Sequence, residues 1–287
     1  MMVEDTEYDK NALGSACNTK FKSHELVEFN TGRRYMIEPE RPNALHTMIR
    51  NWGGKGLVQI LRSVMQTVVI GNDDREPKRS DKYPYRSIAL LVCKVNGKAV
   101  GYGTGFFISS RCLITAGHCV HNGGRWMDSI EVIPGAMATD PSPFGSDVST
   151  DFRSVDGWVV NKDRGYDYGA VLLKTDALYK QVEGHMGFDS MLEARGPIEV
   201  AGYPRDRTYV LTTALGEVLD ASELRLDHNA DTNPGMSGGP LYDPTTYMVK
   251  GVQYWGTEFG NVNYAIRLRP KVAKQWQDWS QIDLLEP

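Results

Sequence analysis

The chain has 287 residues, a formal net charge of -4 and a hydrophobic content of 41%. This composition is enough for a packed core, and all-β folds often reach this length as a single unit. The acidic balance gives no general basic surface for nucleic acid, and no apolar run approaches the ~20 residues that span a membrane, so neither partner is expected. No cofactor is expected, and the 29 glycines are typical of a β-protein rich in turns.

Residues 1–67 differ from the rest of the chain because they mix charges and contain few strand patterns. Residues 43–50 and 57–65 favour short amphipathic helices, separated by a glycine pair. The start of the chain is acidic and polar, and it lacks the basic start and apolar core of a signal peptide. We therefore divide the chain into an N-terminal extension, residues 1–67, and a main unit, residues 68–287.

Many short strands separated by turns follow in the main unit, which favours closed antiparallel barrels and an all-β fold class. An Asn-Gly turn at 96–97 joins the first two strands as a hairpin. The first half is predicted to contain strands at 87–95, 102–109, 112–115, 131–133, 157–160 and 170–173. The second half is predicted to contain strands at 197–202, 208–213, 216–219, 224–227, 240–242, 248–254 and 263–266.

A helical pattern at 271–284 ends the chain and places Trp276 and Trp279 on one side. We expect these two side chains to pack the helix onto the second group of strands.

A serine stands in the small-residue stretch Asn-Pro-Gly-Met-Ser-Gly-Gly-Pro-Leu at residues 233–241. Glycine permits backbone angles that other residues avoid, so such a loop can turn its amides toward one point. We expect the amides of Gly235 and Ser237 to face a developing negative charge, and Ser237 Oγ to be the attacking atom. A glycine-flanked serine alone is a common turn, and its hydroxyl needs a base to remove the proton.

A histidine and an aspartate precede this serine and supply the missing groups. His118 follows an apolar strand in a small-residue corner, and Asp167 stands at the start of another strand. An imidazole can take the hydroxyl proton, and a carboxylate can fix the imidazole tautomer and stabilise its charged form. Taken alone, each has an ordinary structural explanation, a strand-end histidine and a turn cap.

Three motifs in this order resemble the active-site motifs of chymotrypsin-fold serine proteases. They are Thr-Ala-Gly-His-Cys (115–119), Asp-Tyr-Gly-Ala-Val (167–171) and Gly-Met-Ser-Gly-Gly-Pro (235–240). The sequence is most similar to the bacterial glutamyl endopeptidase branch, of staphylococcal and bacillar type. Further segments resemble that branch at 69–75, 83–86, 105–108, 201–204 and 231–232. The resemblance implies a serine endopeptidase that cuts polypeptide substrates through His118, Asp167 and Ser237.

The same resemblance implies the architecture. It predicts two six-stranded antiparallel barrels, the first at about 80–190 and the second at about 195–270, followed by the C-terminal helix. His118 and Asp167 would come from the first barrel and Ser237 from the second. A monomer is expected.

The resemblance also bears on the N-terminus, because the mature enzyme would start near Val68 or Val69. Residues 1–67 would then be a propeptide, removed by an activating protease; an ordinary extension packed on the barrel is the alternative. Secretion is implied by the resemblance, and the missing signal peptide leaves an intracellular location as the other interpretation.

The stretch Gly-Val-Gln-Tyr-Trp-Gly at residues 251–256 resembles the strand that pairs with the substrate backbone and walls the primary specificity pocket. Tyr254, Trp255 and Gly256 are expected along the substrate, and Thr232 at the base of the pocket. Glutamyl endopeptidases place a histidine where this chain has Gln253. A glutamine can donate a hydrogen bond but brings no charge, so selectivity for Glu is in doubt.

Three other groups could supply a cation to that pocket: the freed amino group near Val69, His228, or Arg225. For His228 and Arg225 the alternative is a solvated strand face. Met236 precedes the serine where the digestive branch has an aspartate that pairs with the new N-terminus, and a methionine cannot form that pair. Cleavage near Val69 could then act only by removing the extension or by building the pocket.

The four cysteines are Cys17, Cys93, Cys112 and Cys119. Cys119 matches a position that is disulfide-bonded in many relatives, and the usual partner position is Gly103 here. Cys93 on the neighbouring strand could pair with Cys119, and free buried thiols are the alternative. A zinc site from Cys112, His118, Cys119 and His121 fits no standard spacing, and no metal is expected.

A protease-fold binding protein without turnover, or a latent zymogen, is the alternative to an active endopeptidase. An esterase would carry its serine on a strand-to-helix elbow, which the Gly-Met-Ser-Gly-Gly-Pro context does not match.

Overall fold

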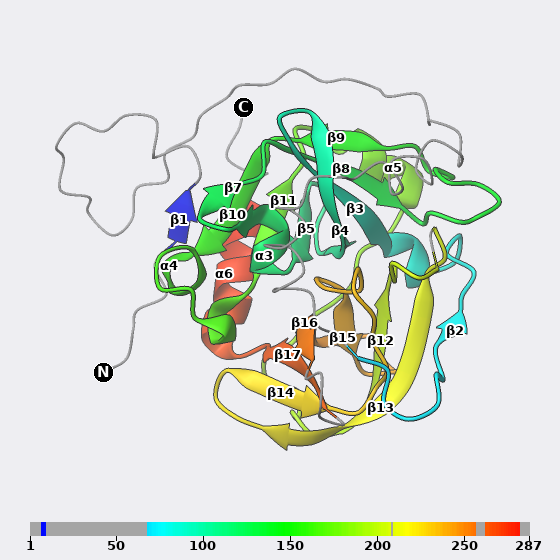
Figure 1. The fold of residues 1–287 in the computed structure, drawn as a ribbon, viewed down its shortest axis with the longest axis vertical. Coiled ribbons are helices and arrows are strands. Elements are labelled where there is room, and N and C mark those ends of the chain that lie inside the picture. Colours follow the sequence, from blue (N-terminus) through cyan, green and yellow to red (C-terminus); the bar gives the residue numbers. More distant parts are fainter. Residues whose placement is uncertain (1–6, 10–67, 208, 257–261, 282–287) are drawn as a thin grey trace, which may run out of the picture.

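Two antiparallel β-sheets form the body of the protein, and each is curled on itself (Figure 1). The structure is a computed structural model, and it describes residues 7–9, 68–207, 209–256 and 262–281. The fold is mostly β, with two curled sheets and a C-terminal helix, as the sequence predicts.

The first sheet is curled rather than fully closed. In spatial order its strands are β1 (Glu7–Asp9), β10 (Asp151–Val155), β11 (Gly169–Leu172), β5 (Cys112–Thr115), β4 (Lys98–Phe107), β3 (Ile88–Val95), β8 (Ser129–Pro134) and β9 (Asp147–Ser149). Only Thr150 separates β9 from β10 in the chain, although they lie toward opposite edges of the sheet. The sheet must therefore curl enough to bring the end of β9 close to the start of β10. No pairing between β9 and β10 is present within the described residues, so the closed six-stranded form predicted for this half is replaced by a half-barrel.

The second sheet closes into a six-stranded barrel, as predicted. Its strands are β12 (Gly196–Gly202), β15 (Pro240–Tyr242), β16 (Val249–Gly256), β17 (Asn263–Arg267), β14 (Arg225–His228) and β13 (Thr212–Ala221), and β12 pairs with β13 to close the ring. A short strand, β2 (Glu76–Pro77), adds to β13 from outside. The segment that leads into β2 therefore runs along this barrel although it precedes the first sheet in the sequence.

The predicted hairpin between β3 and β4 is confirmed. Asn96 and Gly97 have φ angles of 52° and 72°, the left-handed pair that a two-residue turn between strands needs. The strand predicted at 157–160 is wrong. Residues Asp156–Val159 form a helical turn, α4, closed by the Val160 amide on the Asp156 carbonyl, because a Cβ at position 157 would lie 2.3 Å from the Tyr166 ring.

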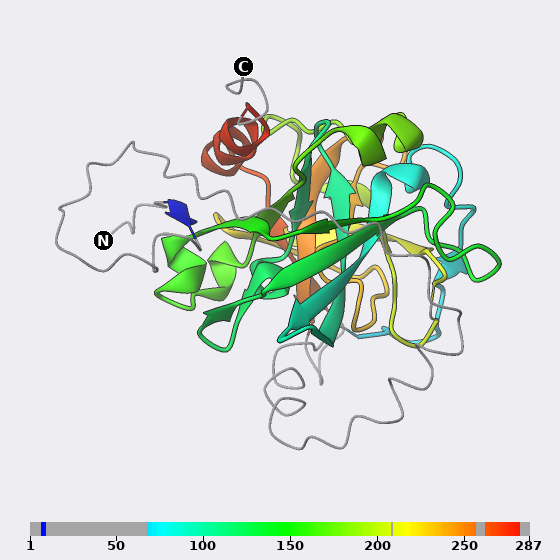
Figure 2. The ribbon, with the colours of Figure 1, turned by 90° about the horizontal axis from the view of Figure 1, so that it is seen from above.

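The C-terminal helix, α6 (Pro270–Gln281), packs elsewhere than expected, and residues 282–284 of the predicted helix lie outside the described residues. Trp276 and Trp279 are fully buried, but their ring partners are Phe106 of β4, Phe188, and Tyr168 just before β11. The helix thus covers the first sheet, as Figures 1 and 2 show, and not the second barrel. It packs the last described residues onto the first sheet, although the chain reaches α6 from β17 of the second barrel.

The remaining short elements are η2 (Tyr85–Ser87), α3 (Gly117–Val120), β6 (His121–Asn122), β7 (Arg125–Trp126), η3 (Arg164–Tyr166) and α5 (Ala177–Val182). The helices predicted at 43–50 and 57–65 lie outside the described residues. Within the described chain, no helix combines the length and apolar character needed to cross a membrane.

Candidate active site

His118 and Asp167 form a tight buried pair on the first sheet. His118 lies on the helical turn α3, and Asp167 directly follows η3. The Nδ1 atom of His118 lies 2.8 Å from Asp167 Oδ2, and the His118 backbone N–H donates to Oδ1 at 2.7 Å. Because the carboxylate can only accept, Nδ1 carries the proton and Nε2 is left free to act as a base.

The glycine at position 117 leaves the room that the contact between His118 and Asp167 needs. A Cβ at Gly117 would lie 3.0 Å from Asp167 Oδ1 and 2.6 Å from the Trp158 ring. Burial would lower the pKa of His118, but the Asp167 carboxylate, with smaller contributions from Cys119, raises that pKa well above its usual value. The aspartate therefore both orients the imidazole and stabilises its protonated form.

Ser237 lies on the loop before β15 and belongs to the second barrel, yet it contacts the first sheet directly. The Thr104 amide of β4 donates to the Ser237 carbonyl at 2.8 Å, and the Cys119 thiol lies 3.8 Å from the same oxygen. Cys119 is the residue after His118, so the serine loop lies against the histidine turn. Ser237 Oγ and His118 Nε2 are both buried, and neither has a hydrogen-bond partner among the described residues.

The serine loop has the shape predicted from its glycines. Gly235 has a φ of 104°, and a Cβ there would lie 2.5 Å from the Tyr203 carbonyl oxygen. The Thr104 hydroxyl donates to the Gly235 carbonyl at 2.8 Å, which fixes the loop from the first sheet. Within the described chain, the amides of Gly235 and Ser237 donate to no other group. Both predicted donors are thus available to a ligand.

Gln253 sits in a buried chain of polar groups beside the serine loop. His228 Nε2 lies 2.7 Å from Gln253 Oε1, and Gln253 Nε2 donates to the Trp255 carbonyl at 3.0 Å. The amide is therefore used at both ends, and its oxygen requires the proton of His228 on Nε2. Burial lowers the pKa of His228 to about 4, so the imidazole is neutral at neutral pH. His228 Nδ1 and Thr232 Oγ1 are buried with no partner among the described side chains.

Two of the predicted cation sources differ from expectation. Arg225 donates to both Asp227 carboxylate oxygens, at 2.6 and 3.0 Å, and its charge is locally balanced. His228 is fully buried, so the solvated strand face considered for it is wrong.

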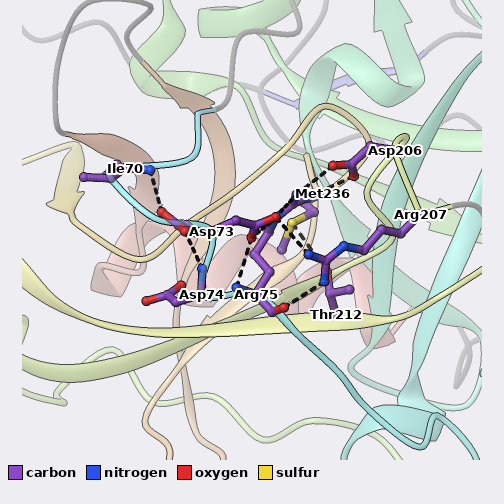
Figure 3. A network of polar contacts seen from close by, with 9 residues as sticks. Ile70, Asp73, Asp74, Arg75, Asp206, Arg207, Thr212 and Met236 are labelled. Atoms are coloured by element: carbon purple, nitrogen blue, oxygen red, sulfur yellow. Dashed lines mark hydrogen bonds and ion pairs between the residues drawn. The ribbon is translucent and has the colours of Figure 1, made fainter.

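The base of this region rests on the segment that precedes β2, which we call the strap (residues 68–75). Asp231 precedes Thr232 and is 1% exposed, and its carboxylate accepts from the Ile70 amide at 2.6 Å and from the Asp74 amide at 3.0 Å. The Thr232 amide donates to the Val68 carbonyl at 3.0 Å. The strap therefore supports both residues of the Asp-Thr pair, and Figure 3 shows how Ile70, Asp73, Asp74 and Arg75 lie along it.

A buried arginine fastens the other end of the strap. Arg75 donates to both oxygens of Asp73 and to both oxygens of Asp206, at 2.6 to 3.0 Å (Figure 3). Arg207 adds bonds to the Arg75 carbonyl and to Asp73. Hydrogen bonding by Arg75 holds the pKa of Asp73 far below its usual value. Met236 lies in the same view, buried in the second barrel with the Thr212 hydroxyl 3.9 Å from its sulfur.

The cysteines do not form the disulfide considered from the sequence. Cys93, Cys112 and Cys119 are buried and form no disulfide with one another, although the Cys93 thiol lies 3.3 Å from the Cys119 carbonyl oxygen. A Cβ at Gly103 would lie 2.5 Å from Cys119 Sγ, so the usual partner position is beside this thiol but has no side chain. Within the described residues, no three His, Cys, Asp or Glu side chains are grouped to hold a metal ion, including the alternative zinc set.

The structure thus brings the three predicted catalytic side chains to the junction of the two sheets. It adds residues that sequence reasoning missed: Thr104, which fixes the serine loop, and Asp231 with Arg75, which hold the strap. The Asp-Thr pair at 231–232 and the segment 69–75, which contains Arg75, carried a sequence signal through their resemblance to other proteases. The contacts of Thr104 and Arg75 join residues more than 130 positions apart, and no local pattern marks them.

Comparisons with known proteins agree with this architecture. Residues 103–252 match the family described as trypsin-like peptidase domain. The chain is 30% identical over 242 residues to an extracellular metalloprotease of Bacillus subtilis, covering 81% of this chain and 76% of that protein. It is 29% identical over 184 residues to the glutamyl endopeptidase of Bacillus licheniformis, covering 62% of this chain and 55% of that protein.

A solved structure of Glu endopeptidase in complex with MPD has the same fold, with a TM-score of 0.67 at 23% identity, over 75% of this chain and 100% of that one. The chain spans about half the length of the glutamyl endopeptidase it matches. The two Bacillus relatives are named for different classes of protease. The family match and the extent of these similarities show that the chain belongs to the trypsin-like peptidases, enzymes that act on polypeptide substrates.

Proposed function

We propose that this protein is a serine endopeptidase that works through His118, Asp167 and Ser237. The observation that carries the proposal is the His118–Asp167 pair, which leaves Nε2 as the free base beside the loop that carries Ser237 Oγ. Ser237 Oγ attacks the carbonyl carbon of the scissile bond while His118 Nε2 takes its proton. The amides of Gly235 and Ser237 stabilise the oxyanion that forms.

The second half of the reaction reverses these roles. The protonated His118 gives its proton to the leaving amine, and an acyl group remains on Ser237. Water then attacks the acyl group with His118 as base, which releases the acid product and restores the hydroxyl. Asp167 keeps the imidazole oriented through both steps and remains ionised.

Active-site labelling tests this proposal. A fluorophosphonate should label the protein at Ser237, and Ser237→Ala and His118→Ala should each abolish peptide cleavage while the fold is retained. Ser222→Ala, on the turn between β13 and β14, is the matched control and should keep both labelling and cleavage. Cleavage at the parent rate by Ser237→Ala would overturn the assignment. Labelling without any cleavage would favour a latent zymogen or a binding protein.

For the primary pocket we propose a preference for Glu and Gln with little discrimination between them. Thr232 Oγ1 and His228 Nδ1 are the unsatisfied polar atoms of this region, and the neutral Gln253–His228 pair brings no permanent charge to it. A carboxylate and a carboxamide can both bond to neutral groups of this kind. The Bacillus licheniformis relative is named a glutamyl endopeptidase, and our proposal differs from that name because this chain has Gln253 at the position of the pocket histidine.

Gln253→His tests the pocket. A histidine that becomes protonated against the substrate carboxylate should raise the ratio of kcat/KM for Glu over Gln by about tenfold, the effect of one charge-assisted hydrogen bond. Gln253→Asn, which keeps a neutral amide, should leave the ratio near its original value. An unchanged ratio in Gln253→His would show that the pocket is built from other groups.

We further propose that residues 1–67 are a propeptide and that the protein acts outside the cell, as the name of the Bacillus subtilis relative states for that protein. N-terminal sequencing of the active form should then find a start near Val68 or Val69. An active form that retains residues 1–67 would contradict the propeptide proposal.

A further inference from the structure

Arg164 lies beside the proposed active site and has no role in the proposed reaction. It is an exposed residue in η3, three positions before Asp167. Its guanidinium carbon lies 3.9 Å from the centre of the Trp255 ring. Trp255 belongs to β16, the strand of the second barrel that is expected to run beside the substrate. A cation from the first half of the molecule is therefore stacked on the strand of the second barrel that is proposed to pair with the substrate.

The backbone that carries Arg164 is held in place on both sides. The Asp163 carboxylate accepts from the Gly165 amide at 2.9 Å, which caps the turn. A Cβ at Gly165 would lie 2.7 Å from the Leu224 side chain of the second barrel, so the turn is packed tightly against the connection between β13 and β14. Tyr166 is buried directly after it. The guanidinium is thus presented from a fixed base, which reduces the entropy lost when it binds a partner.

The charge of Arg164 is unbalanced within the described part of the chain, where no carboxylate lies within ion-pair distance of it. Arg225 gives a direct comparison, because it is stacked on Tyr264 at 4.2 Å in the same barrel region. Arg225 is already bonded to both oxygens of Asp227. Of these two stacked arginines, only Arg164 keeps its outward hydrogen-bond donors for a ligand.

We propose that Arg164 is a specificity-determining residue that binds an acidic side chain of the substrate, located two to four residues before the cleaved bond; the proposal rests on the proposed endopeptidase function. Gln253 belongs to the pocket for the residue before the bond, and β16 continues from it to Trp255 and Gly256. A substrate strand paired antiparallel with β16 would bring its upstream residues past Trp255. A carboxylate there meets the planar donor fork of a guanidinium, which binds carboxylates in a bidentate manner.

Peptide series with one changed position test this proposal. Glu, Gln or Lys is placed in turn at the second, third and fourth residues before the bond, and the residue at the bond is held constant. The protein should cut the Glu peptide about fivefold faster than the Gln peptide, in kcat/KM at low salt, at one of these positions, as expected for a partly exposed ion pair. High salt should reduce this preference.

Variants assign the preference to Arg164. Arg164→Gln should abolish it, Arg164→Glu should favour the Lys peptide, and Arg164→Lys should keep part of it. Arg225→Ala is the matched control and should keep the full preference. Equal rates for Glu and Gln at all three positions, or a preference that survives in Arg164→Gln, would overturn the proposal.

Fluorophosphonate labelling separates this outcome from a failure of the proposed function. Labelling and cleavage of the Gln peptides by the parent protein and by Arg164→Gln show that the catalytic groups work, so an absent Glu preference then counts against Arg164 alone. A parent protein that is folded but neither labels nor cleaves would overturn the endopeptidase function, and the role of Arg164 with it.

Discussion

Thr104 connects the two halves of the site through one side chain and one amide. Its amide binds the Ser237 carbonyl, its hydroxyl donates to the Gly235 carbonyl, and the hydroxyl oxygen accepts from the Tyr203 amide at 3.0 Å. All of these partners belong to the second barrel, whereas Thr104 lies in β4 of the first sheet. The position of the proposed oxyanion donors therefore depends on a residue of the first sheet that has no direct part in the proposed reaction.

We predict that Thr104→Val lowers kcat by about tenfold, less than the loss of an oxyanion donor itself, with a smaller change in KM. Valine keeps the shape but leaves the Gly235 carbonyl and the Tyr203 amide without their hydroxyl partner, which should also cost about 1–3 kcal/mol in the free energy of unfolding. Thr104→Ser keeps the hydroxyl and should restore kcat. Steady-state kinetics and denaturant unfolding of the three proteins check this. An unchanged kcat in Thr104→Val would show that the serine loop keeps its conformation without the Thr104 hydroxyl.

The His118–Asp167 pair predicts the pH dependence. Because the pKa of His118 is raised above its usual 6.5, the imidazole stays protonated at higher pH than a free histidine and cannot accept the serine proton there. The value of kcat/KM should therefore rise with pH through an inflection above 6.5. Asp167→Asn should move this inflection to lower pH and reduce kcat by about 10⁴-fold. Asp176→Asn, a change at an exposed carboxylate, should alter neither, and an inflection that stays in place in Asp167→Asn would contradict the assigned cause.

At the scale of elements, β4 and α3 approach so closely that the absence of a side chain at Gly103 is part of their packing. A Cβ at this position would lie 3.7 Å from the Cβ of Cys119, close to the mean of about 3.8 Å in disulfides. The distance between β4 and α3 at these positions therefore suits a disulfide, but position 103 is a glycine and has no sulfur.

We therefore predict that Gly103→Cys forms a disulfide with Cys119 under oxidising conditions. Closing a loop of about 15 residues should stabilise the oxidised form by about 3 kcal/mol over the reduced form. Peptide mapping without reductant and unfolding with and without reductant measure both effects. Gly103→Cys combined with Cys119→Ser is the control, and it should show no redox-dependent stability. A bridge from the introduced thiol to Cys93 would contradict the predicted geometry.

The elements that were predicted well are those whose evidence is local. The Asn-Gly turn and the alternating strands around it need only neighbouring residues, and the structure has both. The stretch at 157–160 has an apolar pattern that suits a strand, but the room left by Gly157 for the Tyr166 ring decides in favour of a turn. The surface on which α6 packs could not be predicted, because Trp276 and Trp279 indicate that one face of the helix is buried but not which sheet covers it.

At the scale of the whole molecule, the strap makes the start of the main unit part of the second barrel. Asp231 is buried, and the amides that bond its carboxylate come from Ile70 and Asp74. The proposed catalytic residues could be predicted from the sequence because each lies in a short motif. The Asp231–Ile70 contact spans 161 positions, and nothing near either residue indicates the other.

A truncation series checks the strap. A chain of residues 68–287 loses only the short edge strand β1 from the described structure and should unfold at a slightly lower denaturant concentration than the full chain. A chain of residues 76–287 should be less stable by about 3–5 kcal/mol, because Asp231 and Asp206 lose their partners and a buried carboxylate is left unpaired. In residues 68–287, Arg75→Met isolates the arginine contacts and should show part of the loss. Equal stability of the two chains would mean that the pocket base holds without the strap.

The contacts of Val68 show which residues would lose hydrogen bonds if the chain were cut between Val68 and Val69. Val68 exchanges two hydrogen bonds with the Asn263 carboxamide, at 2.8 and 3.1 Å, and its carbonyl accepts from the Thr232 amide. Release of the upstream fragment would strip these three bonds from the floor of the pocket and leave an ammonium group one residue from the Ile70 amide that Asp231 binds. Ser237 and His118 would keep every contact they have. A cut at this bond would therefore change the surroundings of the proposed specificity pocket and leave the proposed catalytic groups in their present contacts.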